Sequence, residues 1–278
     1  MTTPTAQAPA ARADQLNKIY GDGPTRVTAL DQVCLEIGTG TFTAIMGPSG
    51  SGKSTLMHCM AGLDSADGGQ VWIGGTEITT LPERRLTRLR RDRVGFVFQA
   101  YNLLPALTAA DNITLPLDIA GRSADQDWLG TVVDTVGLAP RLRHRPAELS
   151  GGQQQRVAIA RALAGRPDII FADEPTGNLD SRAGAEVLDL LRGCVREFGQ
   201  TIVMVTHDPV AACYAGRVVF LADGRIAGAL DRPSPQAVLD AMAALDPAYG
   251  PVTEEPGRRP PGGSGGSLPR ASRDLGSE

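Results

Sequence analysis

The chain has 278 residues, 42% of them hydrophobic, which is enough to bury one or two hydrophobic cores. Its 27 basic and 31 acidic residues give a net charge of −4, which excludes recruitment of nucleic acid by an overall basic field, so we expect no nucleic-acid partner. The start lacks a signal-peptide pattern, and no apolar run approaches the roughly 18 residues that cross a bilayer, so we expect a soluble, cytoplasmic chain.

The N-terminal residues 1–13 are rich in alanine, threonine and proline, and we predict that they are disordered. A folded domain then extends from residue 14 to about residue 230. Its first part contains four short β-like runs, which we place at residues 33–37, 41–46, 70–73 and 94–98. The second of these runs leads directly into a glycine-rich turn.

This turn fits the pattern G-x-x-x-x-G-K-[ST] of a phosphate-binding loop. The strand before it and a predicted helix over residues 54–60 direct the positive end of the helix dipole at bound phosphates. Lys53 is expected to reach the β- and γ-phosphates, and the Ser54 hydroxyl to coordinate Mg²⁺. The loop consists of Gly47, Pro48, Ser49, Gly50, Ser51, Gly52, Lys53, Ser54 and Thr55.

Lysine is rare in this chain, arginine is clustered, and the cysteines are scattered. Of the 27 basic residues only Lys18 and Lys53 are lysines, and Lys53 stands where a compact ammonium fits and a planar guanidinium does not. A dense arginine run is either a solvated helix face or a surface for anionic lipid or an acidic partner: Arg84, Arg85, Arg88, Arg90, Arg91 and Arg93. We interpret four scattered cysteines without a CxxC pair as reduced, small apolar residues: Cys34, Cys59, Cys194 and Cys213.

From about residue 100 to residue 165 the pattern becomes helical, which predicts a helical insertion in an α/β core. Near its end, Ser150 is a natural N-cap for a helix that begins with two glycines and runs through residue 163. The free N–H groups and the dipole at the start of this helix form a second anion site.

Two carboxylates, Asp173 and Glu174, directly follow a predicted buried strand at residues 169–172. At the tip of a parallel strand Asp173 can hold Mg²⁺ through water, while Glu174 can orient or deprotonate an attacking water. The alternative is that the pair is an ordinary helix-start feature. A helix over 180–198 and a buried strand over 201–205 then complete a β-α-β unit.

The C-terminal part is predicted to close the domain with a hairpin. Its strands are residues 217–222 and 225–229, joined by an Asp-Gly turn. A short helix at 235–245 belongs to a C-terminal extension of residues 231–250. Residues 251–278 are rich in Pro, Gly, Ser and Arg, and are expected to form a disordered tail.

Together with the phosphate loop, Leu-Ser-Gly-Gly-Gln at residues 149–153 resembles the signature of the ATP-binding-cassette (ABC) ATPases. Over residues 14–230 the resemblance implies an α/β fold: a P-loop NTPase (RecA-like) core with a peripheral antiparallel β-subdomain and an inserted α-helical subdomain. ATP and Mg²⁺ would be the ligands. The resemblance assigns adenine stacking to Tyr20, the catalytic base to Glu174, the γ-phosphate switch to His207, Mg²⁺ to Ser54, Gln99 and Asp173, and communication across a dimer to Asp180.

The resemblance also implies partners. In the family two subunits form a head-to-tail homodimer in which the signature residues Ser150, Gly151, Gly152 and Gln153 contact the ATP of the partner protomer. The strings at 99–105, 108–116 and 172–180 are similar to macrolide-exporter, lipoprotein-releasing and cell-division ABC ATPases. These imply a separate integral-membrane permease of the four-helix type, and a peripheral position on the inner face of the cell membrane.

Two functions stay open within that subfamily. One is an ATPase that drives export or mechanotransmission, and the other is a cell-division-type ATPase that regulates a cell-wall hydrolase through its membrane partner. A soluble ABC protein acting on ribosomes or DNA would require a tandem cassette or a long coiled-coil insertion, and the sequence contains neither. For the permease, Leu103, Leu104 and Leu107 would form an apolar docking patch if exposed, and otherwise pack inside the helical insertion.

Overall fold

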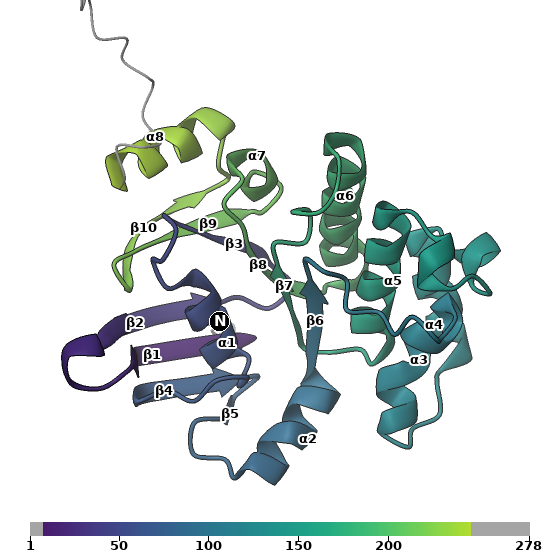
Figure 1. The fold of residues 1–278 in the computed structure, drawn as a ribbon, viewed down its shortest axis with the longest axis horizontal. Helices are drawn as coiled ribbons and strands as arrows, with labels where there is room; N and C mark the ends of the chain where they lie inside the picture. The colour runs from purple at the N-terminus through teal and green to yellow at the C-terminus, as the bar shows by residue number, and fades with distance from the viewer. Residues whose placement is uncertain (1–7, 246–278) are drawn as a thin grey trace, which may run out of the picture.

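The computed structural model describes residues 8–245, which form two β-sheets flanked by helices (Figure 1). The larger sheet has the strand order β10-β9-β3-β8-β7-β6. Its strands run parallel except β10, which pairs antiparallel with β9 at one edge. They are β3 (Phe42–Met46), β6 (Val94–Phe98), β7 (Ile169–Asp173), β8 (Thr201–Val205), β9 (Arg217–Ala222) and β10 (Arg225–Asp231).

The smaller sheet is antiparallel, with the order β2-β1-β4-β5. Its strands are β1 (Ala11–Tyr20), β2 (Val27–Ile37), β4 (Gly68–Ile73) and β5 (Thr76–Glu77). The prediction that residues up to 13 are disordered is therefore wrong at its end, because β1 begins at Ala11. Ala11 and Ala13 alternate into the core and are buried between β2 and β4, so small side chains that resemble a linker in the sequence are interior residues here.

Helices cover both faces of the larger sheet. The helix α1 (Lys53–Met60) packs between the two sheets, while α3 (Ala109–Ile119), α4 (Gln126–Val136), α5 (Gly151–Ala164) and α6 (Ser181–Phe198) cover the opposite face (Figure 1). The others are α2 (Glu83–Arg93), α7 (Pro209–Ala212) and α8 (Pro235–Leu245), and three 3-10 turns lie at Gly23–Thr25, Ala139–Arg141 and Pro146–Glu148. Within residues 8–245, no helix combines the length and the apolar character that crossing a bilayer requires.

The central strands are apolar throughout because both of their faces are buried. In β3, Ala44 and Met46 lie in the core beneath the helices, whereas Ile45 lies in the core shared with α1 and the smaller sheet. In β8, Met204 and Val205 divide between the same two cores. This arrangement confirms the predicted α/β architecture with its antiparallel sheet and helical insertion.

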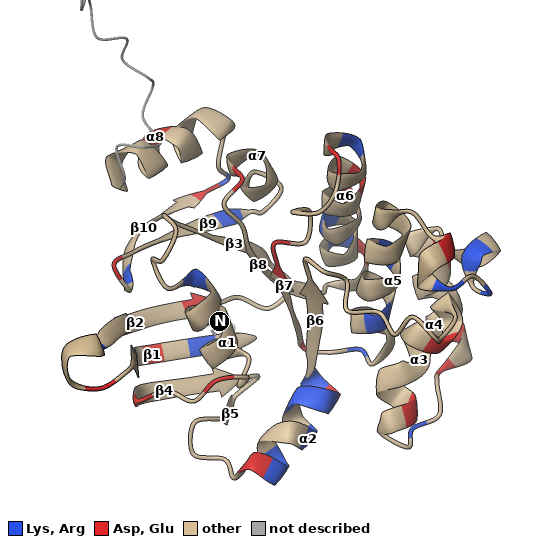
Figure 2. Cartoon of the chain, viewed as in Figure 1, with Lys and Arg blue, Asp and Glu red and all other residues tan. Residues whose placement is uncertain are grey.

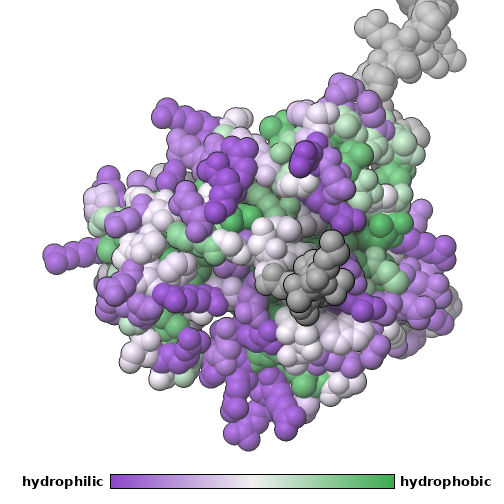
Figure 3. All heavy atoms as spheres, turned by 180° about the vertical axis from the view of Figure 1, so that it is seen from behind, coloured by the Kyte–Doolittle hydropathy of each residue, from purple (hydrophilic) through white to green (hydrophobic). Residues whose placement is uncertain are grey.

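The C-terminal hairpin and helix are also confirmed. Asp223 and Gly224 both have positive φ (47° and 73°), as the tight turn between β9 and β10 requires. Gly224 lies against the smaller sheet, since its carbonyl accepts from the Asp31 N–H (2.9 Å). Seen from behind, the surface is mostly hydrophilic, with apolar areas that include part of α8 at the upper right (Figure 3). The predicted tail of residues 251–278 lies outside the described residues.

Candidate functional site

The phosphate loop joins the carboxyl end of β3 to α1 and is wedged between distant strands. Gly47 and Gly52 have φ values of 154° and 99°. A Cβ atom at Gly47 would collide with the carbonyl oxygen of Leu221, and one at Gly52 with that of Ala29. Gly50 (φ 77°) faces open space instead. Packing therefore requires two of the glycines, and the third leaves the loop accessible to a ligand.

Lys53 lies over this loop with its ammonium group held by loop oxygens. Its Nζ donates to the carbonyls of Gly47 (2.9 Å) and Pro48 (2.6 Å), and reaches Ser51 Oγ at 3.5 Å. Burial lowers the pKa of Lys53, and the charges of Glu174 and Asp173 oppose that shift. No side chain caps the N-terminus of α1, so its free N–H groups and the Lys53 ammonium lie together at the phosphate loop.

The two predicted carboxylates follow one another at the end of β7. Burial raises the pKa of Asp173, Glu174 adds to that rise, and His58 and Lys53 oppose it. Glu174 leaves the strand with φ 43°, and its N–H donates to the Val205 carbonyl (2.9 Å). Its carboxylate then lies 2.8 Å from His207 Nδ1, measured to Oε1. The fold thus brings the predicted base and the predicted switch histidine, 33 residues apart in sequence, into direct contact.

Gln99 and Asp180 meet partners that sequence reasoning did not name. Gln99 Nε2 donates to Asn178 Oδ1 (3.2 Å), and Asn178 Nδ2 donates back to the Gln99 carbonyl (3.0 Å). Asp180 caps α6, because its Oδ1 accepts from the N–H groups of Arg182 (3.0 Å) and Ala183 (2.9 Å). The only sequence signal for Asn178 was its place between Gly177 and Asp180.

The signature helix α5 begins as predicted. Ser150 Oγ accepts from the Gln153 N–H (3.3 Å), and Gln153 Oε1 accepts from the Ser150 N–H (3.0 Å), which makes a capping box. Sequence reasoning missed Gln155, which is fully buried and donates through Nε2 to the Pro175 carbonyl (2.7 Å). This bond ties the signature helix to the segment that carries Glu174. Among the described residues, no hydrogen bond or ion pair joins residues 150–153 to the phosphate loop.

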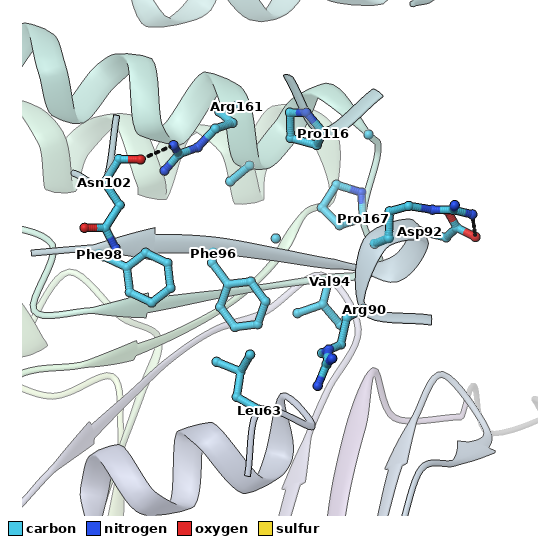
Figure 4. Close-up of a pocket in the computed structure, with 14 residues that line it drawn as sticks. Leu63, Arg90, Asp92, Val94, Phe96, Phe98, Asn102, Pro116, Arg161 and Pro167 are labelled. Carbon is cyan, nitrogen blue, oxygen red and sulfur yellow. Dashed lines mark hydrogen bonds and ion pairs between the residues drawn. The ribbon is translucent and has the colours of Figure 1, made fainter. Parts of the chain in front are cut away.

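A hollow of about 390 Å³ opens beside β6, the edge strand of the larger sheet (Figure 4). Phe96 and Phe98 of the strand line it, together with Leu63. On its other side Arg161 of α5 donates to the carbonyls of Tyr101 (2.8 Å) and Asn102 (2.6 Å), and so fixes the chain that follows Gln99.

The predicted apolar patch next to this hollow is smaller than expected. Leu104 is 47% exposed, but Leu103 packs against the helical core and Leu107 is half-buried. Leu103 therefore follows the alternative interpretation, packing inside the insertion directly after the segment that Arg161 holds.

The arginine run forms most of α2 (Figure 2). Arg90 pairs with Glu83 (2.8 Å), Arg91 with Asp92 (2.8 Å) and Arg93 with Asp168 (2.6 Å), so half of the run forms ion pairs within the chain. The other three side chains are exposed: Arg84, Arg85 and Arg88.

Comparison with known proteins adds a family assignment. The sequence profile of the family described as "ABC transporter" matches residues 30–177. A macrolide export ATP-binding/permease protein MacB from Marinobacter nauticus is 44% identical over 253 residues, which cover 90% of this chain and 37% of that protein. The lipoprotein-releasing system ATP-binding protein LolD from Bordetella pertussis is 43% identical, with 81% of this chain and 99% of that protein covered. The chain thus spans just over a third of the first relative and almost all of the second.

Among solved structures, the dimeric ATP-binding cassette MJ0796 bound to ADP and Pi superimposes with a TM-score of 0.72. It is 41% identical to this chain, and the match covers 81% of this chain and 99% of the cassette.

Proposed function

This chain belongs to the ABC transporter family, as an ATP-binding protein related to the MacB and LolD export systems, and we propose that it binds and hydrolyses ATP to power a separate membrane permease. The observation that supports this most directly is the cluster at the ends of β3, β7 and β8. There the charges of Asp173 and Glu174 act on the ammonium of Lys53, and Glu174 is hydrogen-bonded to His207.

The cluster provides the parts that phosphoryl transfer to water requires. Lys53 and the N–H groups of α1 neutralise the phosphates. Glu174 accepts the proton of the attacking water, and His207 orients the water and the γ-phosphate beside it. Tyr20, 43% exposed at the end of β1, offers its ring to the adenine.

The same region fits Mg²⁺ by the chemistry of its donors. Ser54, Gln99 and Asp173 offer hydroxyl, amide and carboxylate oxygens, which are the ligands Mg²⁺ prefers. When bound with the nucleotide, the metal would neutralise phosphate charge.

A dimer accounts for the second anion site. In one protomer α1 and α5 pack on opposite faces of the larger sheet, with Leu56 in one core and Val157 in the other. The signature residues at the start of α5 then serve the ATP held by the partner protomer. The solved MJ0796 cassette, a dimer bound to ADP and Pi, supports a dimer of this chain.

The hollow beside β6, with Leu104 nearby, is where we place the permease. An apolar floor of Phe96, Phe98 and Leu63 suits a short helix of a membrane protein. The permease, of the four-helix type, would hold the chain on the inner face of the cell membrane. Because Arg161 connects this wall to α5, movement of the permease would reach the signature helix.

The proposal is tested by measuring phosphate release and nucleotide binding in the presence of Mg²⁺. The wild-type protein, alone or with its permease, is expected to release inorganic phosphate from ATP. Glu174→Gln should bind ATP with little turnover, and Lys53→Ala should lose binding in calorimetry. Glu197→Gln, at an exposed carboxylate near the other end of α6, serves as the control. Absence of phosphate release by the wild-type complex would refute the proposal.

A further inference from the structure

Lys18, the only lysine besides Lys53, is buried directly beneath Tyr20, the predicted adenine contact. It lies near the end of β1 and is only 6% exposed. Its Nζ donates to Asp64 Oδ1 (2.8 Å) and to the Ser65 carbonyl (2.7 Å). The same ammonium lies 5.0 Å from the centre of the Tyr20 ring. One face of that ring therefore rests on a cation.

The carboxylate of Asp64 binds both the Lys18 ammonium and the Tyr20 hydroxyl. Asp64 accepts from Lys18 on Oδ1 and from the Tyr20 hydroxyl on Oδ2 (2.6 Å). Burial alone would raise the pKa of Asp64, but hydrogen bonds from Lys18 and Tyr20 outweigh it and lower the pKa. Burial and the bond to Asp64 raise the pKa of Tyr20, against a lowering by Thr55 of the phosphate loop. Asp64 thus stays an acceptor and Tyr20 a donor at neutral pH.

The backbone around Tyr20 is tied to the same segment. The Ile19 N–H donates to Asp67 Oδ2 (2.6 Å), and the Asp67 N–H donates to the Asn17 carbonyl (2.9 Å). Asp64 and Asp67 both lie in the connection between α1 and β4. Since α1 begins at Lys53, one helix sets the separation between the phosphate loop and the tyrosine ring.

We propose that Lys18 and Asp64 are positioning residues that fix the Tyr20 ring in the orientation that stacks on the nucleobase. The inference depends on the proposed role of Tyr20 as the adenine contact. Fixing the ring beforehand lowers the side-chain entropy that ATP binding would otherwise cost.

The test compares ATP with inorganic tripolyphosphate, which lacks the base, by calorimetry. Asp64→Asn and Lys18→Met should weaken ATP binding by about 3- to 10-fold and leave tripolyphosphate binding unchanged. In steady-state hydrolysis KM for ATP should rise at constant kcat. Tyr20→Phe keeps the ring over Lys18 and removes the hydroxyl that donates to Asp64, so it should fold and show a smaller loss. Asp168→Asn, which breaks an ion pair elsewhere, is the matched control.

A double-mutant cycle separates positioning from a general structural effect. In a Tyr20→Ala background, Asp64→Asn should cause no further loss of ATP affinity. A further loss there, or a parallel loss for tripolyphosphate, would overturn the inference. If Tyr20→Ala itself leaves ATP affinity unchanged while Lys53→Ala abolishes it, the adenine assignment fails and the inference fails with it. If Tyr20→Ala weakens ATP and neither Asp64→Asn nor Lys18→Met does, only the inference fails.

Discussion

The position of the Asp173 carboxyl group at the end of β7 lowers the stability of the fold at neutral pH. Burial raises its pKa above the ordinary value of 3.8, so the folded state holds its proton more tightly than the unfolded state. The stability it contributes is complete below pH 3.8 and is lost as pH rises to the higher folded pKa. At neutral pH the ionised group therefore opposes folding, which is a cost of holding a ligand for Mg²⁺.

Asp173→Asn should for that reason be more stable than the wild type although it is less active. We expect the free energy of unfolding at pH 7 to rise, because the variant removes a charge that burial disfavours. The difference should shrink as pH falls toward 4, because the wild-type carboxyl group takes up a proton as pH falls through its raised pKa. Urea denaturation at both pH values measures this, and a less stable variant at pH 7 would contradict it.

At the scale of single elements, Asp180 has a structural task that the sequence did not reveal. It was predicted to communicate across a dimer, and in the structure its carboxylate caps α6. Asp180→Ala should lower the free energy of unfolding by about 1 kcal/mol, while Asp180→Asn, which can still cap, should lower it much less. Thermal and urea denaturation measure the two effects. If the charge of Asp180 is needed for communication across the dimer, both variants should lose ATP hydrolysis. If Asp180 acts only as a helix cap, ATP hydrolysis should fall only in the alanine variant.

The elements that could be predicted best are those buried on both faces. The strand at 201–205 is buried throughout and matches the structure at both ends, and the edge strand at 94–98 matches as well. The start of β1 was missed because alanines carry little sign of burial. Within the site, the residues that belong to contiguous motifs could be identified from the sequence. Asn178, Gln155 and Asp64 were not assigned a role, because their partners lie 79, 20 and 46 residues away and only the fold brings them together.

At the scale of the whole molecule, the proposed dimer predicts that two inactive variants can restore each other. Lys53→Ala lacks its own phosphate cradle, and Ser150→Arg blocks the signature surface offered to the partner. A mixed dimer retains one site with both parts intact, so an equal mixture should recover about a quarter of wild-type phosphate release. Each variant alone should be inactive. A mixture without activity, although a tag on one variant co-purifies the other, would argue against sites shared between protomers.

The proposed permease surface can be tested on the intact complex. Leu104→Asp places a charge beside the hollow at β6, so it should abolish stimulation of phosphate release by the permease and weaken co-purification. Leu239→Asp, at an exposed leucine on α8, is the control and should behave as the wild type. Unchanged stimulation in Leu104→Asp would place the permease elsewhere.

The wedged glycines of the phosphate loop have a consequence for how this chain could evolve. Gly47 lies against Leu221 and Gly52 against Ala29, so packing requires both whether or not a nucleotide binds. Lys53, Glu174 and His207 are not required in this way. In a descendant that no longer hydrolyses ATP, we expect Lys53, Glu174 and His207 to change first, while Gly47 and Gly52 stay. The two glycines of the motif would then persist after the activity is lost.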